Sequence, residues 1–183
     1  MNIPKYSVKF HYPKKNNYAL VIPVLNEGER FLNQISKIYN LAANIDLIII
    51  DGGSQDGSIN EKILKEKNVN SLLILNDSPG LSSQLRVAYF FCLERNYKGI
   101  VTMDGNGKDD PKDIQTFINK LDNGYDYVQG SRYVKGGVSK NTPIDRVIAN
   151  RFIHAPLLSI SSGYCFTDTT NGFRGYSRSF LRN

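Results

Sequence analysis

Two oxygen-bearing side chains follow a short apolar run in the second half of the chain. The run is Gly99-Ile-Val-Thr-Met103, and Asp104 and Asn106 come directly after it. A carboxylate and an amide oxygen two residues apart can reach the same hard cation, because such cations prefer oxygen ligands. Asp104 and Asn106 are therefore candidate ligands for Mg²⁺ or Mn²⁺. An ordinary acidic turn explains this stretch equally well when it is considered alone.

Polar side chains also follow three other apolar runs. Asn26 and Glu27 follow the first run, Asp51 the second and Arg132 the last. Glu27 and Asp51 can accept hydrogen bonds from sugar or base groups, and the planar guanidinium of Arg132 suits phosphate. A divalent cation next to a diphosphate neutralises a leaving group without covalent help from the protein. These residue types favour chemistry on a nucleotide diphosphate.

Other nucleotide and metal motifs do not fit. The first apolar run lacks a following Gly-x-Gly-x-x-Gly, which argues against dinucleotide binding. Lys108 is followed by Asp109 rather than Ser or Thr, so no P-loop is formed. A calcium loop beginning at Asp104 would place Lys108 at its fifth position, Asp109 where glycine is needed and Gln115 in place of the final Glu. The sequence excludes all three motifs.

Five apolar runs alternate with helical patterns and must position these side chains. Because the first run contains Pro23, we expect its strand to end near Ile22. Strands that alternate with helices through short loops indicate an α/β fold with a doubly wound, mostly parallel sheet in a single domain. Ligands bind outside the carboxyl ends of the strands in such sheets, so the polar groups should meet at one edge. The predicted strands are residues 18–22, 45–50, 71–75, 99–103 and 125–129.

The intervening helices are predicted from apolar spacing and from capping residues. Ser58 and Glu61 form a capping box that begins one helix. Asp110 and Pro111 begin another, and Thr142-Pro143 caps a third. The buried face of the helix between the third and fourth strands is predicted to consist of Leu81, Leu85, Ala88, Tyr89 and Cys92.

Composition limits the class of protein further. The 183 residues are 40% apolar and 22% charged, which is ordinary for a globular domain. A net charge of +6 favours anionic partners, but the basic residues are scattered and accompany no nucleic-acid motif, so we expect no nucleic-acid partner. The sequence has neither a signal-peptide pattern nor an apolar run of membrane-spanning length, and the expectation is a cytoplasmic protein.

Five short segments, in order, resemble family 2 glycosyltransferases with the GT-A fold, particularly the dolichol- and polyprenyl-phosphate sugar transferase branch. No single segment is specific to the family, but all five occur in the order in which the family has them. They are Ile22-Pro-Val-Leu-Asn-Glu27, Asp51-Gly-Gly-Ser-Gln-Asp-Gly-Ser58, Met103-Asp-Gly-Asn106, Gly130-Ser-Arg-Tyr133 and Thr170-Asn-Gly-Phe-Arg174.

The resemblance implies an inverting, metal-dependent transfer of a sugar from a UDP- or GDP-sugar. Asp104, with Asn106, would hold Mg²⁺ or Mn²⁺ on the diphosphate, and Arg132 and Arg146 would contact phosphate of the donor or the acceptor. Asp168 lies where many relatives keep a carboxylate near the acceptor, and is the weaker candidate for a general base. The nucleoside site would comprise Pro23, Leu25, Asn26, Glu27, Asp51, Gly53 and Ser54.

The resemblance also implies partners and boundaries. The acceptor would be a lipid phosphate, such as polyprenyl phosphate, or a glycan precursor of the cell envelope, with peripheral association at the cytoplasmic face of a membrane. Residues 1–17 would be a lead-in, and residues 18–183 a GT-A catalytic domain truncated at its C-terminal end.

Three departures from the family pattern matter, and Asn106 together with the end of the sequence at Asn183, where relatives continue, keeps a second function open. Asn106 replaces the second acidic residue of Asp-x-Asp, and Gly52 replaces the second acidic residue of Asp-Asp-Gly-Ser. A nucleotide-sugar binding module, or an inactive fragment of such an enzyme, is the alternative. A nucleotidyltransferase of similar fold is less favoured, because Leu25-Asn26-Glu27 is not a glycine-rich basic loop.

Structural roles remain open for several of these residues. Pro23 to Glu27 can be a plain strand exit, and Asp51 to Ser58 a tight turn with a helix cap. Arg146 can belong to a structural ion pair, and Asp168 can cap a turn.

Overall fold

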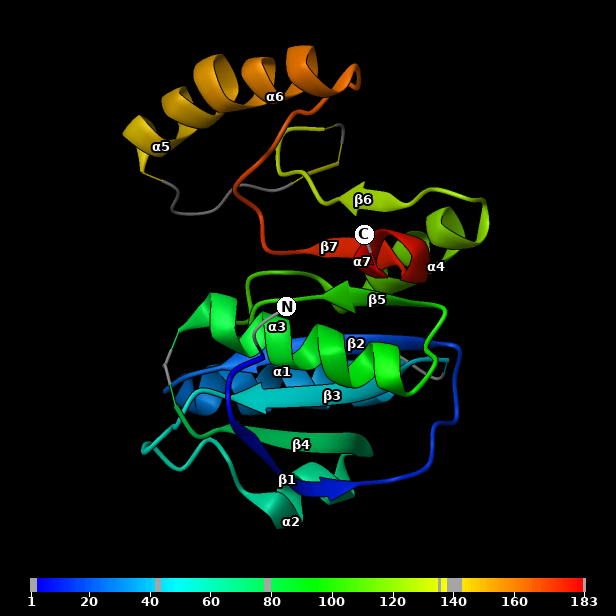
Figure 1. Ribbon diagram of the computed structural model, residues 1–183. Helices are drawn as coiled ribbons and strands as arrows, with labels where there is room; N and C mark the ends of the chain where they lie inside the picture. The colour runs from blue at the N-terminus through cyan, green and yellow to red at the C-terminus, as the bar shows by residue number, and fades with distance from the viewer. Residues whose placement is uncertain (1–2, 42–43, 78–79, 135, 138–142, 183) are drawn as a thin grey trace.

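A seven-stranded sheet forms the centre of the molecule (Figure 1). The structure is a computed structural model that describes residues 3–41, 44–77, 80–134, 136–137 and 143–182. The strands lie in the order β1-β4-β3-β2-β5-β7-β6. Their bounds are β1 (Tyr6–His11), β2 (Tyr18–Val24), β3 (Asp46–Asp51), β4 (Val69–Leu75), β5 (Gly99–Thr102), β6 (Tyr127–Gln129) and β7 (Arg174–Ser177).

The central strands are parallel, which confirms the predicted α/β class. β2 pairs in parallel with both β3 and β5, and β3 pairs in parallel with β4. β1 and β7 run antiparallel to their neighbours. All five predicted strands are present, whereas β1 and β7 were not predicted. β1 is a polar edge strand, and β7 lies in a glycine-punctuated segment, so neither carries a strong apolar signal.

Helices cover both faces of the sheet. On one face, Leu20, Ile22 and Val24 of β2 belong to the same apolar core as Phe31 and Ile35 of α1. On the other face, Ala19 and Val21 of β2 share a core with Val87 and Phe91 of α3. The helical elements are α1 (Gly28–Leu41), α2 (Glu61–Glu66), α3 (Leu81–Glu94), η1 (Pro111–Asp113), α4 (Ile114–Asp122), α5 (Ile144–Ile148), the π-helix η2 (Ala149–His154), α6 (Ala155–Ser162) and α7 (Arg178–Arg182).

Some local predictions need correction. β2 continues through Pro23 to Val24, because Pro23 lies beyond Val21, the last residue of β2 that pairs with β5. The predicted capping box is wrong: Asn60 is the N-cap of α2, and its side chain accepts from the N–H groups of Lys62 and Ile63. The Ser58 hydroxyl instead donates to Asp56 Oδ1 at 2.6 Å.

The other two predicted caps have different outcomes. Asp110 caps the turn at Pro111, as predicted, by accepting from the N–H of Lys112. Thr142 lies outside the described residues, and Pro143 precedes the first residue of α5.

The buried face of α3 differs from the predicted one. Ala88 and Cys92 are buried as expected, but Leu81 is 52% exposed, and Leu85 and Tyr89 are only partly buried. The face of α3 that packs on the sheet is rotated about the helix axis from the predicted face. Small and polar residues, Ser83 and Gln84, take part in this buried face, and apolar spacing does not detect them. The buried residues of α3 are Ser83, Gln84, Val87, Ala88, Phe91 and Cys92.

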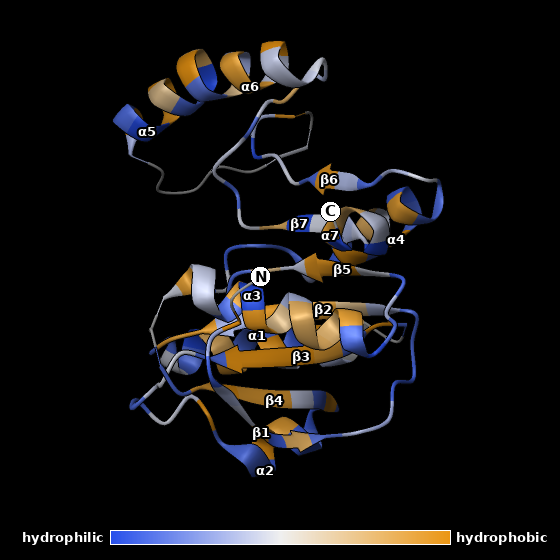
Figure 2. Ribbon diagram, in the orientation of Figure 1, coloured by the Kyte–Doolittle hydropathy of each residue, from blue (hydrophilic) through white to orange (hydrophobic). Residues whose placement is uncertain are grey.

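A helical arm (residues 144–162) stands away from the sheet (Figure 1). It consists of α5, η2 and α6, and Figure 2 shows apolar residues along much of its length. Its large apolar side chains are exposed to solvent, which is unusual for a helix of this composition. Among the described residues, no helix reaches the length and apolar character that a bilayer span requires. The exposed apolar residues of the arm are Ile144, Ile148, Phe152, Ile153, Leu157, Leu158 and Ile160.

Candidate functional site

The carboxyl ends of β2, β3 and β5 lie at one edge of the sheet, as the fold class requires. Asn26 and Glu27 come shortly after β2, Asp51 ends β3, and Asp104 follows β5. The strand pairing therefore brings together three of the four groups expected at this edge. Ser131 and Arg132 follow β6, which joins the sheet through β7.

The loops after β2 and β3 hold one another through their own side chains. We call residues 25–28 and 51–56 the paired loops. Ser54 donates from its hydroxyl to Asp51 Oδ1 at 2.6 Å, and that hydroxyl accepts from the Asn26 N–H at 3.0 Å. Asn26 Oδ1 accepts from the Gln55 N–H, and Asp56 Oδ2 accepts from the Gly28 N–H. The paired loops are thus already braced without a ligand.

Asp51 itself is buried within this network. Both of its carboxylate oxygens accept from the Ser54 N–H, at 3.0 and 3.2 Å. The hydrogen bonds between Asp51 and Ser54 serve the shape of the loop, while the side chain of Leu25 is exposed at the surface of the same loops.

Two acidic side chains after β5 are in the opposite situation. Burial raises the pKa of Asp104, although the charges of Arg174 and Lys108 lower it in part. Burial and the charge of Asp104 together raise the pKa of Asp109 to about 6. We call Asp104 and Asp109 the carboxylate pair. Two desolvated acids that repel each other are stabilised by a cation between or beside them.

Asn106 shapes the loop between these two acids. Its Oδ1 accepts from the Lys108 N–H at 3.0 Å, and Gly107 adopts φ +73°, a conformation that favours glycine. Asn106 and Asp109 also line a pocket of about 270 Å³ beside α1. The role of Asn106 as a metal ligand stays a prediction.

A second pocket, of about 150 Å³, reaches Asp104 from the α3 side of the sheet. Leu81, Leu85 and Tyr89, which were predicted to be core residues, form part of its wall. Gly172 also lines it, and a Cβ added at Gly172 would overlap the Asp104 carboxylate. Only glycine at position 172 lets the Asp104 carboxylate lie this close to the backbone of residue 172.

A larger pocket lies elsewhere. It measures about 460 Å³ and is lined by Asp46 at the start of β3, by Val69 at the start of β4, and by Lys15 and Lys67. It therefore opens at the amino ends of the strands. The residues whose chemistry points to a nucleotide lie at the opposite edge, so the smaller pockets are the relevant ones.

Arg132 is bound to Asp168 through two parallel contacts. Its Nε donates to Asp168 Oδ2 at 2.7 Å and its second guanidinium nitrogen donates to Oδ1 at 3.0 Å. Asn150 donates from its amide to Asp168 Oδ1 at 2.8 Å, and Thr170 accepts from Arg132 at 2.6 Å. We call these four residues the charge cluster.

The charge cluster stabilises the ionised form of Asp168, whose side chain is fully buried. Burial alone would raise the pKa of this carboxyl group, but the Arg132 hydrogen bonds and further backbone and Asn150 bonds lower it to about 2. A carboxylate of such low pKa is a weak base. Its role as a general base stays a prediction, and its surroundings are those of an ion-paired group.

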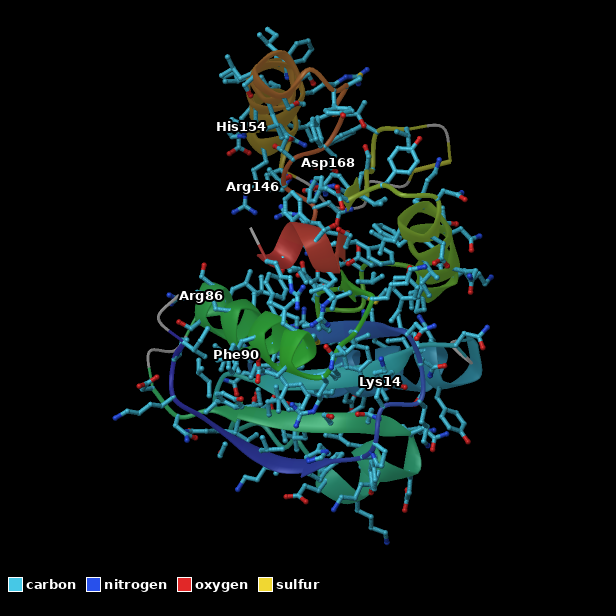
Figure 3. All side chains as sticks on the ribbon, turned by 45° about the vertical axis from the view of Figure 1, so that its right-hand side comes forward. Lys14, Arg86, Phe90, Arg146, His154 and Asp168 are labelled. Atoms are coloured by element: carbon cyan, nitrogen blue, oxygen red, sulfur yellow. The ribbon has the colours of Figure 1, made fainter. Side chains whose placement is uncertain are left out.

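Arg146 lies apart from this cluster. It is exposed on α5, and Figure 3 shows it with His154 on the helical arm, whereas Asp168 lies on the segment that leads back to β7. The structure therefore places the two predicted phosphate-contacting arginines, Arg132 and Arg146, on different elements.

Sequence reasoning gave too little weight to two residues. The sequence pattern favours Asn106 over Asp109 as the second ligand, although Asp109 follows Asp104 in the same glycine-rich loop. Arg174 donates to the carbonyl oxygens of Asn171 and Thr169, and its charge acts on Asp104. It stands in the Asn-Gly-Phe-Arg segment, which is the only sequence signal for it.

The protein side chains alone do not complete a metal site. Within the described ranges, no group of three or more His, Cys, Asp or Glu side chains could hold a metal ion. The carboxylate pair fits a cation only if other ligands, such as substrate phosphates, join it.

Comparisons with known proteins identify the family and the fold. The sequence model of the family described as glycosyl transferase family 2 matches residues 19–183. Polyprenol monophosphomannose synthase of Mycolicibacterium smegmatis is 26% identical over 165 residues, covering 88% of this chain and 62% of that protein. Dolichol-phosphate mannosyltransferase of Saccharomyces cerevisiae is 25% identical, covering 91% of this chain and 62% of that protein. The chain thus spans less than two thirds of the length of these relatives.

A solved structure shares the fold. Glucosyl-3-phosphoglycerate synthase of Mycobacterium tuberculosis, crystallised with Mn²⁺, uridine diphosphate and glucosyl-3-phosphoglycerate, superposes with a TM-score of 0.62 at 19% identity. The match covers 93% of this chain and 64% of that chain. With the family match extending over nearly the whole sequence, and with the GT-A arrangement of its sheet, the chain belongs to glycosyl transferase family 2.

Proposed function

We propose that this chain carries the catalytic site of an inverting glycosyltransferase that moves a sugar from a nucleotide-diphosphate sugar to a lipid phosphate of the polyprenyl type. The carboxylate pair carries the proposal. Asp104 and Asp109 have raised pKa values at the carboxyl edge of the sheet. A cation that binds there together with a diphosphate would stabilise the ionised forms of both carboxyl groups. The polyprenyl and dolichyl relatives support this acceptor class.

The carboxylate pair fits Mg²⁺ or Mn²⁺. Asp104 would be one ligand, and either Asp109 or Asn106 the second. The surroundings favour Asp109, because its carboxyl group lies beside Asp104 with a raised pKa, whereas Asn106 offers a neutral amide oxygen that accepts from the Lys108 N–H. Such an ion, when bound, supplies positive charge that stabilises the departing diphosphate. The Mn²⁺ in the solved relative supports the choice of cation.

The paired loops would hold the nucleoside. Their braced backbone presents Pro23, Leu25, Asn26 and Glu27 on one side, and Asp51, Gly53 and Ser54 on the other. Because Asp51 and Ser54 already bond each other, the proposed recognition uses their fixed geometry rather than free side chains.

The transfer itself needs little from a general base. An oxygen of the acceptor phosphate is already anionic, so it can attack the anomeric carbon directly. The bond from that carbon to the diphosphate breaks, the nucleoside diphosphate leaves, and the configuration inverts. Asp168, with a pKa of about 2, is then a positioning residue that holds Arg132 toward phosphate.

The helical arm suits an acceptor that is part of a membrane. Its exposed apolar side chains, with Arg146 and Arg151 beside them, can rest on an anionic lipid surface. Arg146 would then meet the acceptor phosphate. We place the protein at the cytoplasmic face of a membrane as a peripheral partner, on the strength of this arm and of the lipid-linked relatives.

The test is a transfer assay with UDP- and GDP-sugars, polyprenyl phosphate and Mn²⁺ or Mg²⁺. We expect release of nucleoside diphosphate that requires both metal and acceptor. Binding of a nucleotide sugar without transfer or hydrolysis would instead support the alternative, a nucleotide-sugar binding module or an inactive fragment. Failure to bind any UDP- or GDP-sugar in calorimetry would refute both.

A further inference from the structure

A buried glutamine on α3 joins the ends of two strands. Gln84 is 3% exposed, and its amide nitrogen donates to the carbonyl oxygen of Val24 at 2.8 Å and to that of Ile50 at 2.9 Å. Both partners are acceptors, so only the NH₂ end of the amide can face them. The two donors of one side chain therefore tie the last residue of β2 to the strand next to it.

The tied residues immediately precede the paired loops. Val24 leads into Leu25, and Ile50 leads into Asp51. The Val24 carbonyl also accepts from the Gly52 N–H at 2.9 Å, so a helix, a strand end and a loop meet at this oxygen. A substitution at Gln84 would therefore change the distance between the two paired loops.

Gly52 leaves the space that Gln84 fills. A Cβ added at Gly52 would lie 3.1 Å from Gln84 Nε2 and 3.2 Å from the amide carbon. Gly52 does not have a positive φ, so alanine is compatible with its backbone and only the amide stands in the way. The small residue at position 52 and the glutamine at position 84 thus form one steric unit.

A second buried glutamine braces the other half of the site. Gln34 of α1 is 2% exposed, and its amide nitrogen donates to the Asp104 carbonyl oxygen at 2.9 Å. It comes from the helix layer on the opposite face of the sheet. Gln34 supports the strand end that carries the carboxylate pair, whereas Gln84 supports the paired loops.

We propose that Gln84 is a positioning residue for nucleoside recognition, and that the small residue at position 52 exists to admit its amide. The proposal rests on the function proposed above. It assigns the geometry of the paired loops to a side chain that does not touch the nucleotide, and it predicts that nucleoside affinity and metal coupling can be separated by mutation.

The experiment compares Gln84→Met with Gln34→Met. Methionine keeps much of the shape of glutamine and removes the donors. UDP and GDP are titrated by calorimetry into each protein, first with EDTA and then with Mn²⁺, and the nucleotide that binds the unmodified protein is followed. We expect Gln84→Met to weaken binding in EDTA at least tenfold. Gln34→Met should change binding in EDTA less than twofold and reduce the gain on adding Mn²⁺.

Urea unfolding of each variant separates positioning from stability. A lower unfolding free energy with an unchanged dissociation constant in EDTA would overturn the proposal. Equal weakening of binding in EDTA by both variants would overturn it too, because the effect would not be specific to Gln84. If the unmodified protein binds neither nucleotide, the proposed function fails and the assignment of Gln84 fails with it.

Gly52→Ala provides an independent variant if Gln84→Met does not fold. The added methyl group should displace the Gln84 amide and weaken nucleotide binding in EDTA threefold or more. In a Gln84→Ala background the same change should have less than a twofold effect, since the obstructing amide is gone. Additive effects of the two substitutions would contradict the steric unit.

Discussion

The carboxylate pair consists of partly buried aspartates and the charge cluster is built around a fully buried one, and their electrostatics are opposite. Asp168 receives hydrogen bonds from Arg132, Asn150 and Thr170, and its pKa falls to about 2. Asp104 and Asp109 are desolvated near each other, and their pKa values rise. In the charge cluster the protein itself supplies the partners that stabilise the aspartate charge. In the carboxylate pair the two aspartate charges still need a cation.

This difference indicates where a ligand belongs. A carboxylate whose partners are all supplied by the protein gains little from a further cation, whereas a repelling pair gains much. Sequence motifs do not distinguish the two cases, because the family resemblance assigns a functional role to Asp104 and to Asp168 alike. The surroundings of each carboxylate do distinguish them.

The largest expected effect is at Asp104. Asp104→Ala should remove the metal-dependent part of nucleoside diphosphate binding, because Asp104 is the first proposed ligand of the cation. The expected loss of affinity is at least about 100-fold, or ~2.7 kcal/mol. Calorimetry with Mn²⁺ and with EDTA measures it. Metal dependence that survives in the variant would show that the cation lies elsewhere.

Asp168→Asn should reduce stability rather than metal dependence. Removing one partner of a buried ion pair costs about 3–5 kcal/mol, and we expect about 2–3 here because Arg132 is partly exposed. The folded-state pKa of about 2 lies below the ordinary 3.8, so this contribution is complete above about pH 4 and is lost as the pH falls toward 2.

Urea unfolding of both proteins at pH 7 and at about pH 3 tests this expectation. The difference in unfolding free energy between unmodified protein and variant should shrink at the lower pH. A constant difference would mean that the charge of Asp168 is not what stabilises the cluster.

Asp109→Asn should have the opposite sign in metal-free protein. Because the pKa of Asp109 is raised to about 6, its ionised form destabilises the fold above that pH, and a neutral amide should add about 1 kcal/mol at pH 8. Unfolding in EDTA measures the gain. Destabilisation instead would place Asp109 among structural carboxylates like Asp168.

The smallest effect is expected at Asn106. Asn106→Asp should change Mn²⁺ affinity less than threefold, because the oxygen at this position already accepts from Lys108 and shapes the turn. Titrations of Mn²⁺ with and without nucleoside diphosphate provide the comparison. Much tighter binding without nucleotide would identify Asn106 as the second ligand after all.

Much of the fold could be predicted from sequence because the central strands are nearly continuous apolar runs. Ile48, Ile49 and Ile50 are buried on both faces of β3, and a pattern of this kind is hard to mistake. β7 was not predicted, since Gly175 and Ser177 give it no alternation, and only its neighbours β5 and β6 determine its place.

The position of the site was predictable, but its electrostatics were not. Residues after strand ends meet at one edge in any parallel sheet, which brings Asp51 and Asp104 together. Which carboxylates are satisfied depends on partners far away in sequence, such as Arg132 for Asp168. The glutamines were missed for the same reason, because Gln84 has no motif and lies 60 residues from its partner Val24.

The place of β7 also determines when the site can form. β7 lies between β5 and β6, and β6 joins the sheet only through it among the described strands. Gly172, just before β7, is the residue that covers Asp104. During synthesis β2 to β5 can assemble first, but the Asp104 carboxyl group stays hydrated until residues 172–177 arrive from some 70 residues downstream. Its burial would therefore report the pairing of β7 with β5.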